Sequence, residues 1–227
     1  MKVRAIAVVV PARDEEATID ACLALLAVAR AELADRHPDI EVRTCVVADR
    51  CVDRTRERAG HHGSVQIVHC DAGNVGHARA AGVAHLLDGL DPAATWIANT
   101  DADSTVPPQW LASQVDDAER GADAVVGTVR PDFADLSGEQ VRRWLERHIP
   151  GQPNGHVHGA NLGVAAKAYL EVGGFRPLVE HEDVDLVRRL TIAGFTIHNS
   201  DAAEVITSSR LVGRTPGGYS AYLARGA

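Results

Sequence analysis

Short β-branched runs alternate with amphipathic helical periods along the first half of the 227-residue chain, and this alternation limits the fold more than any other feature. The runs predict strands at 6–10, 42–48, 65–69 and 95–99. The segments between them predict helices at 19–26, 53–59 and 80–87. Such alternation is typical of an α/β fold with a mostly parallel central sheet, helices on both faces and right-handed crossovers.

The second half adds elements of the same kinds but no clear linker, so we expect one domain over 1–227. Ser137 and Gln140 predict a capping box at the start of one helix. The segment 149–159 is rich in Gly, Pro and His and is expected to form a loop over a site. Further helices are predicted at 109–118, 166–172 and 183–193, and strands at 124–129, 162–164, 196–198 and 204–207.

The composition is that of a soluble globular protein, with 45% hydrophobic and 24% charged residues. A formal net charge of −8 with dispersed basic residues argues against nucleic acid as a partner. No apolar run approaches the roughly 20 residues of a membrane span, and the opening run at 5–10 is too short for a signal peptide. The four cysteines lack Cys-x-x-Cys spacing, so we expect reduced thiols in a cytoplasmic protein; they are Cys22, Cys45, Cys51 and Cys70.

Polar side chains collect directly after the four strands predicted in the first half. Ligands of open parallel sheets bind at the carboxyl ends of the strands, so these segments are expected to border one site. The segments are Pro11-Ala12-Arg13-Asp14-Glu15-Glu16, Ala48-Asp49-Arg50-Cys51-Val52-Asp53, Asp71-Ala72-Gly73-Asn74-Val75-Gly76-His77-Ala78-Arg79 and Asp101-Ala102-Asp103.

Most of these segments also have a purely structural interpretation. The acidic residues of the first are equally typical of a helix start, and Asp49 and Asp53 of a turn and a cap. Asp101 and Asp103 are more specific, because two carboxylates one residue apart after a buried strand repel each other unless a cation or water intervenes. Carboxylate oxygens favour Mg²⁺ or Mn²⁺, which are usually shared with substrate phosphates.

The order of these segments resembles the family-2 glycosyltransferases, which have the GT-A fold. The resemblance covers nearly the whole chain and implies a nucleotide-sugar-binding half at about 1–105 and an acceptor-binding, catalytic half at about 106–227. It is carried by the motifs above together with Gly173-Gly174-Phe175 and Glu182-Asp183-Val184-Asp185-Leu186.

The resemblance implies a role for each matching residue on the donor side. Asp49 would accept a hydrogen bond from the base, and Arg79 would help to hold the nucleotide. Asp101-Ala102-Asp103 matches the family's Asp-x-Asp motif, which holds the metal, Mn²⁺ or Mg²⁺, and the ribose and diphosphate of the donor. The residues expected to border the nucleoside are Pro11, Ala12 and Glu15.

On the acceptor side, Asp183 matches the carboxylate proposed as the general base. The implied reaction is an inverting single displacement, in which a sugar moves from a nucleoside-diphosphate sugar, expected to be a UDP-sugar, to a hydroxyl acceptor. His181 and His198 are additional candidates for a metal or phosphate. The residues expected to line the acceptor pocket are His156, His158, Asn161 and Glu182.

The chain departs from the family pattern at four places. Asp14 stands where the first loop usually carries Asn. The second strand ends in Ala48-Asp49 where Asp-Asp is common, and Arg50-Cys51 replaces the Gly-Ser that usually follows. The Gln-x-x-Arg-Trp motif of processive members is absent, which favours the transfer of one sugar per cycle over polymerisation.

Three other functions stay open. A sugar-phosphate nucleotidylyltransferase would need a Gly-rich basic loop after the first strand, where this chain is acidic. An inert nucleotide-sugar-binding protein would be expected to lack Asp103 or Asp183, and both are present. A dinucleotide oxidoreductase would need Gly-x-Gly-x-x-Gly after the first strand, which this chain does not have.

Overall fold

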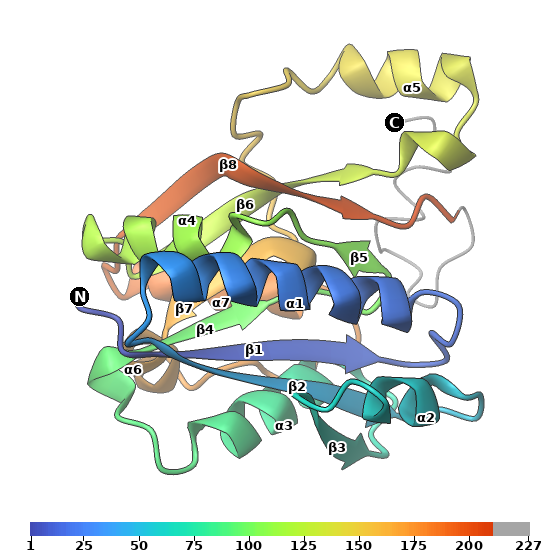
Figure 1. Ribbon diagram of the computed structural model, residues 1–227. Coiled ribbons are helices and arrows are strands. Elements are labelled where there is room, and N and C mark those ends of the chain that lie inside the picture. Colours follow the sequence, from blue (N-terminus) through green and yellow to red (C-terminus); the bar gives the residue numbers. More distant parts are fainter. Residues whose placement is uncertain (211–227) are drawn as a thin grey trace.

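A computed structural model describes residues 1–210, which are built around one eight-stranded sheet (Figure 1). The strands lie in the order β3-β2-β1-β4-β7-β6-β8-β5. Their bounds are β1 Ala5–Ala12, β2 Glu41–Asp49, β3 Gln66–Cys70, β4 Thr95–Asn99, β5 Ser104–Thr105, β6 Ala124–Pro131, β7 Leu162–Ala165 and β8 Ile197–Thr207.

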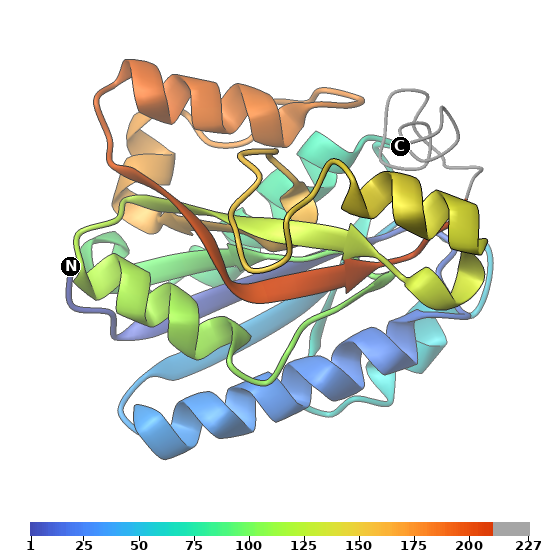
Figure 2. The same ribbon diagram turned by 90° about the horizontal axis from the view of Figure 1, so that it is seen from above.

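Helices cover both faces of the sheet, as the alternating pattern predicts (Figure 2). The helices α1 and α4 pack together on one face, α3, α6 and α7 lie on the other, and α2 packs against α1. The helices are α1 Ile19–Arg36, α2 Thr55–Gly60, α3 Val75–Leu87, α4 Trp110–Glu119, α5 Gly138–Leu145, α6 Ala166–Glu171 and α7 Glu182–Ile192, with short 3₁₀ turns η1 Pro92–Ala94, η2 Phe133–Asp135 and η3 Gly159–Asn161.

The sheet is mostly parallel. Strand β1 pairs in parallel with β2 and β4, β2 with β3, and β6 with β8. Strand β7 is inserted antiparallel between β4 and β6. The consecutive carboxyl ends of β2, β1 and β4 therefore meet at one edge, where loops can form a site.

The core follows from the apolar runs of the sequence. Residues Ile6 to Val10 of β1 are fully buried, because helices cover the central strand on both sides. Each buried Val or Ile of this kind contributes about 1.5–3 kcal/mol to folding. Helix α1 turns Ile19, Cys22 and Leu26 toward the sheet, as its i, i+3, i+7 spacing predicts.

The prediction that the chain ends in two separate strands is wrong. The segments 196–198 and 204–207 belong to the single strand β8. Strand β8 pairs with β6 through residues 197–200 and again through 205–207, and the register shifts between Gly127 and Val129. The short strand β5, which was not predicted, pairs with the end of β8.

Helix α5 begins with the predicted capping box, in which Ser137 and Gln140 satisfy each other's backbone amides.

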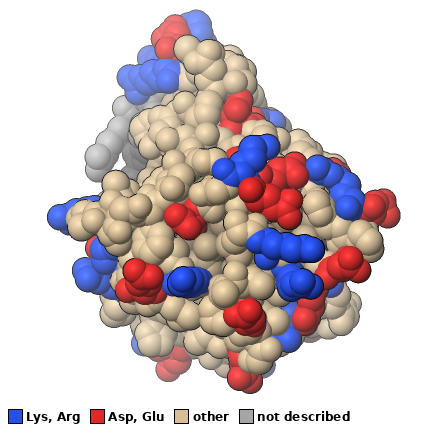
Figure 3. All heavy atoms as spheres, turned by 90° about the vertical axis from the view of Figure 1, so that its left-hand side faces the viewer, with Lys and Arg blue, Asp and Glu red and all other residues tan. Residues whose placement is uncertain are grey.

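Within residues 1–210 no helix combines the length and the apolar character needed to cross a membrane. Acidic and basic side chains are interspersed on the face at the amino ends of the parallel strands (Figure 3).

Candidate functional site

A pocket of about 570 Å³ opens at the carboxyl ends of the parallel strands. It is bordered by the loops after β1, β3 and β4, by the last residue of β2, by the segment 156–160, by the start of α7 and by the end of β8. Every residue predicted to contact the donor lines this pocket: Pro11, Ala12, Glu15, Asp49, Arg79, Asp101, Ala102 and Asp103. The predicted residues His156, His158, His181, Glu182 and Asp183 line it from the opposite half.

Three non-glycine residues in left-handed backbone conformation surround the pocket. Asp14 follows β1 with φ 51°, Arg50 follows β2 with φ 54°, and His181 precedes α7 with φ 61°. Each such conformation costs on the order of 1–3 kcal/mol and persists where the surrounding structure holds it. The backbone is thus strained at three of the turns that shape this site.

The buried carboxylate of Asp49 organises the loop after β3. Its two oxygens accept hydrogen bonds from the backbone amides of Gly73 and Asn74, both at 2.8 Å. The Asn74 side chain caps α3 through the amide of His77 and donates to the carbonyl of Pro177 at 3.0 Å. Asp49 therefore anchors a loop that connects the donor half to the opposite half.

Arg79 is a buried bridge between the two halves. Its Nη2 lies 2.6 Å from Asp101 Oδ1, and its Nε lies 3.0 Å from Glu182 Oε1. A Cβ atom at Gly159 would collide with this guanidinium, so glycine is required for the close approach. Burial and the neighbouring Asp183 raise the pKa of Glu182, while Arg79 opposes that rise. Arg79 thus fixes Asp101 and Glu182 in place.

Asp103 is also paired with an arginine, and that arginine was not predicted from the sequence. Arg210 Nη2 lies 2.8 Å from Asp103 Oδ2 and 2.8 Å from Glu15 Oε1. Burial and repulsion from Asp101 raise the pKa of Asp103 to about 6, and Arg210 opposes this rise. No motif marks Arg210 in the sequence, because it is a single basic residue after an irregular strand.

The pairing of β5 with β8 is what brings Arg210 to the site. Ser104 Oγ donates a hydrogen bond to Thr207 Oγ1 at 2.8 Å, and the amide of Ser208 donates to the carbonyl of Asp103 at 3.1 Å. The Asp-x-Asp segment and the end of β8 are therefore joined backbone to backbone. The contact joins two segments about a hundred residues apart in the sequence, and both border the pocket.

Asp183 lies in the first turn of α7 and faces the pocket. Its Oδ2 accepts a hydrogen bond from the Gly159 amide at 2.6 Å, and its Oδ1 accepts one from Val184 at 2.7 Å. The neighbouring acids are placed differently. Glu182 is buried against Arg79, and Asp185 lies outside the pocket lining, where it pairs with Arg189 at 2.8 Å.

A row of aromatic rings runs from α5 to the pocket, where His148, His156 and His158 form part of the wall. Trp144 and His148 stack in parallel, with ring centroids 4.1 Å apart. His156 follows at 6.0 Å from His148, and His158 at 6.2 Å from His156. Burial lowers the pKa of His158 to about 4, with His156 and His148 adding to the effect, so its imidazole is neutral at pH 7.

Two predicted residues lie away from the pocket. Asn161, expected on the acceptor side, is buried in the core, where it accepts from Trp110 Nε1 at 2.9 Å and donates to the carbonyls of Thr128 and Ala203. The second is His198, whose Nδ1 lies 3.2 Å from Asp117 Oδ1 and which does not border the pocket.

The residues present fit a divalent cation at the Asp101–Asp103 pair. The Asp103 side chain is largely buried, and its pKa is raised by burial and by Asp101. A cation shared by Asp101 and Asp103 would relieve the repulsion between them. Hard oxygen ligands of this kind suit Mn²⁺ or Mg²⁺. Each carboxylate already has an arginine partner, Arg79 for Asp101 and Arg210 for Asp103.

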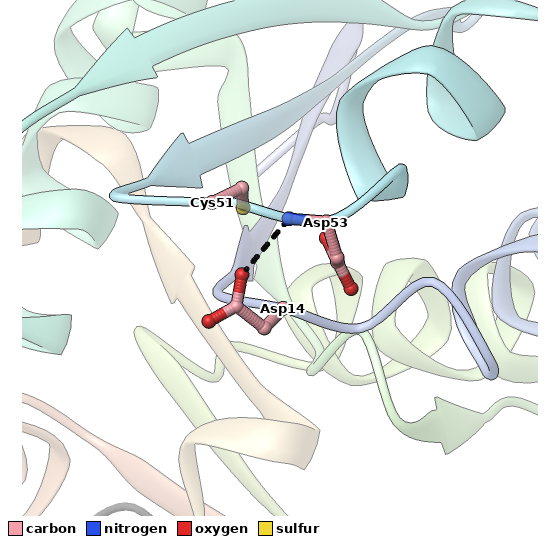
Figure 4. Close-up of side chains that lie close together, drawn as sticks. All are labelled: Asp14, Cys51 and Asp53. Atoms are coloured by element: carbon pink, nitrogen blue, oxygen red, sulfur yellow. Dashed lines mark hydrogen bonds between the residues drawn. The ribbon is translucent and has the colours of Figure 1, made fainter.

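A second acidic group is a weaker candidate for a cation. Ligand atoms of Asp14, Cys51 and Asp53 lie within 4.8 Å of one another (Figure 4). Asp14 Oδ1 already accepts from the amides of Val52 and Asp53, and Asp53 Oδ1 accepts from Thr55. None of the three lines the pocket, and burial raises the pKa of the Cys51 thiol. These carboxylates hold the first and second loops together.

Comparison with known proteins points to one family. The model described as Glycosyl transferase family 2 matches residues 7–166. No protein with a curated description matches the sequence significantly.

Solved structures share the fold at low sequence identity. The mannosyltransferase PcManGT from Pyrobaculum calidifontis, in complex with GDP-Man and Mn²⁺, is 21% identical with a TM-score of 0.66, over 98% of this chain and 60% of that one. S. aureus TarS is 15% identical with a TM-score of 0.60, over 92% of this chain and 37% of the TarS chain. Glucosyl-3-phosphoglycerate synthase from Mycobacterium tuberculosis, in complex with Mn²⁺, UDP and phosphoglyceric acid, is 18% identical with a TM-score of 0.57, over 86% of this chain and 67% of the synthase. This chain therefore spans less than two thirds of the length of PcManGT and of TarS.

Proposed function

The chain belongs to glycosyl transferase family 2 and has the GT-A fold, and we propose that it is a cation-dependent, inverting transferase of single sugars. The donor is a nucleoside-diphosphate sugar and the acceptor carries a hydroxyl group. The observation that carries the proposal is one pocket that holds the Asp101–Asp103 pair on one side and Asp183 on the other. PcManGT and the glucosyl-3-phosphoglycerate synthase, which share the fold, were solved with a nucleotide and Mn²⁺, and this supports the same donor class here.

On the donor side, the loop that Asp49 anchors receives the base, and Pro11, Ala12 and Glu15 border the nucleoside. Asp101 and Asp103 would hold the cation, which would supply positive charge to stabilise the departing diphosphate. Arg79 keeps Asp101 oriented through the 2.6 Å ion pair, so this ligand is positioned before the donor arrives.

On the acceptor side, Asp183 removes the proton of the attacking hydroxyl. Its two amide hydrogen bonds orient the carboxylate, and its partial exposure lets an acceptor reach it. A positioned base contributes about 10²–10⁴-fold to the rate. Attack from this side on the anomeric carbon, with the diphosphate leaving on the opposite side, inverts the configuration of the sugar.

The histidine wall formed by His148, His156 and His158 supplies flat ring surfaces on the side of the pocket where Asp183 lies. With the neutral His158 nearest η3, this wall is suited to contact the acceptor. The four cysteines, which are free thiols in the structure, agree with the cytoplasmic location that we also propose.

The test is a thermal-shift panel of UDP, GDP, ADP, UDP-glucose and GDP-mannose, with Mn²⁺, Mg²⁺ or chelator. A ligand at 100 times its Kd should stabilise the fold by about 2.7 kcal/mol. We expect stabilisation only with a cation, and its loss in Asp103→Asn but not in the exposed control Asp39→Asn. Equal shifts with chelator would show that the cation role is wrong.

Product analysis separates this function from the nucleotidylyltransferase alternative. A glycosyltransferase releases a nucleoside diphosphate from the donor, whereas a nucleotidylyltransferase transfers a nucleotidyl group from a nucleoside triphosphate to a sugar phosphate and releases pyrophosphate. Release of pyrophosphate from a nucleoside triphosphate would overturn the proposal.

A further inference from the structure

Arg210 contacts two carboxylates from different loops of the donor site: Glu15, which is buried, and Asp103, whose side chain is 12% exposed. Its Nη2 lies 2.8 Å from Asp103 Oδ2 and 2.8 Å from Glu15 Oε1, and its Nη1 lies 3.1 Å from Glu15 Oε2. The guanidinium thus makes a bidentate contact with the Glu15 carboxylate and also neutralises Asp103. Charged pairs of this geometry are among the stronger polar contacts in proteins.

Within residues 1–210, the pocket lining has more carboxylates than arginines. Asp101 and Glu182 share Arg79, and Asp103 and Glu15 share Arg210. An ionised carboxylate that is buried without a positive partner is costly, so Arg210 is what stabilises the charged form of Asp103 when no cation is bound.

The two arginines differ in how firmly they are held. The side chain of Arg79 is 2% exposed and lies on α3 beneath the pocket. The side chain of Arg210 is 36% exposed and lies just beyond the end of β8. Arg79 is therefore enclosed by the core, whereas part of the Arg210 side chain is in contact with solvent.

We propose that Arg210 competes with the divalent cation for Asp103, so that it acts as an exchangeable counter-ion of the donor site. The inference rests on the cation site of the proposed function. A dication bound to Asp103 and an arginine on the same oxygen would repel each other, so Arg210 must leave Asp103 when the cation binds. The donor diphosphate provides a new partner for the guanidinium, so cation and donor should bind together rather than in sequence.

The experiment measures Mn²⁺ binding to the whole protein without nucleotide, from the electron paramagnetic resonance signal of free Mn²⁺. Arg210→Gln removes the competing charge, and we expect it to bind Mn²⁺ at least about fivefold more tightly than the parent. The matched control is Arg36→Gln, which removes the same charge from an exposed arginine–aspartate pair between α1 and α4. The control should bind like the parent.

Two further variants separate charge from shape. Arg210→Lys keeps the positive charge and should keep the parent affinity for Mn²⁺. The double variant Arg210→Gln, Asp103→Asn should lose the gain, because Asp103 is the ligand in competition. The proposal is overturned if Arg210→Gln binds Mn²⁺ no more tightly than Arg36→Gln, if Arg210→Lys gains as much as Arg210→Gln, or if the double variant keeps the gain.

The outcome is separable from that of the proposed function. A protein that releases no nucleoside diphosphate from any donor would refute the proposed reaction, yet the ranking of Mn²⁺ affinities would still decide the role of Arg210. Equal Mn²⁺ affinities with normal turnover would refute only the competition. Far-ultraviolet circular dichroism of each variant verifies that a changed affinity does not come from loss of the fold.

Discussion

The Asp183 carboxylate accepts a hydrogen bond from the backbone amide of Gly159 at 2.6 Å, which joins the first turn of α7 to the segment that carries the histidine wall. Gly159 also lies against the Arg79 guanidinium, where no larger residue fits. The proposed base, the acceptor wall and the Arg79 bridge therefore meet at one glycine. Four predictions follow from this arrangement and its surroundings.

Replacing the proposed base should impair turnover but not donor binding. Asp183→Asn can still accept from the Gly159 amide but cannot take a proton, so we expect kcat to fall by about 10²–10⁴-fold. Donor affinity, measured by calorimetry, should stay near that of the parent. Asp185→Asn is the matched control, because Asp185 pairs with Arg189 outside the pocket. A rate for Asp183→Asn within a few-fold of the parent would move the base assignment to Glu182.

Removal of the Asp49 carboxylate should loosen base selection. Asp49→Ala deletes the acceptor for the amides of Gly73 and Asn74, so the loop that borders the base loses its anchor. We expect weaker binding of the preferred nucleotide and a flatter ranking of UDP, GDP and ADP in calorimetry. Asp71→Ala, at an exposed position in the same loop, is the control. An unchanged ranking in Asp49→Ala would place the base elsewhere.

Arg79 should matter for stability as much as for activity. Arg79→Met leaves Asp101 and Glu182 without their shared partner, and breaking a buried ion pair in this way costs about 3–5 kcal/mol. Urea unfolding measures the loss. Arg142→Met removes an exposed pair with Glu146 and should cost at most about 1 kcal/mol. Equal unfolding midpoints for the two variants would contradict the bridging role.

Acid should destabilise the fold through His158. Its pKa is about 4 in the folded protein because of burial, against an ordinary value of 6.5, with Asp101 opposing the shift. Between these values the unfolded chain binds a proton that the folded chain does not, so the free energy of unfolding falls as pH drops from 6.5 to 4. His158→Gln should flatten this dependence, and the exposed His61→Gln should not. Parallel pH curves for parent and His158→Gln would rule the histidine out as the cause.

Local patterns were sufficient for much of the fold. The predicted strand at 95–99 matches β4, and the capping box at Ser137 is confirmed, because apolar periodicity and cap chemistry act over a few residues. The resemblance to family 2 is confirmed by the match to residues 7–166. Collection of the polar strand ends at one pocket was also predictable, since parallel strands place their carboxyl ends at the same edge.

The sequence by itself determined the parallel core, the loops that follow its strands and the carboxylates those loops carry. Only the tertiary structure decided which side chains neutralise those carboxylates. Asn161 is of a residue type that often binds ligands, but its side-chain amide donates hydrogen bonds to backbone carbonyls in the core. Arg210 belongs to no sequence motif, and it reaches Asp103 because β5 pairs with β8. Such contacts join residues about a hundred positions apart, and no local pattern encodes them because their free energy arises only when the sheet has formed.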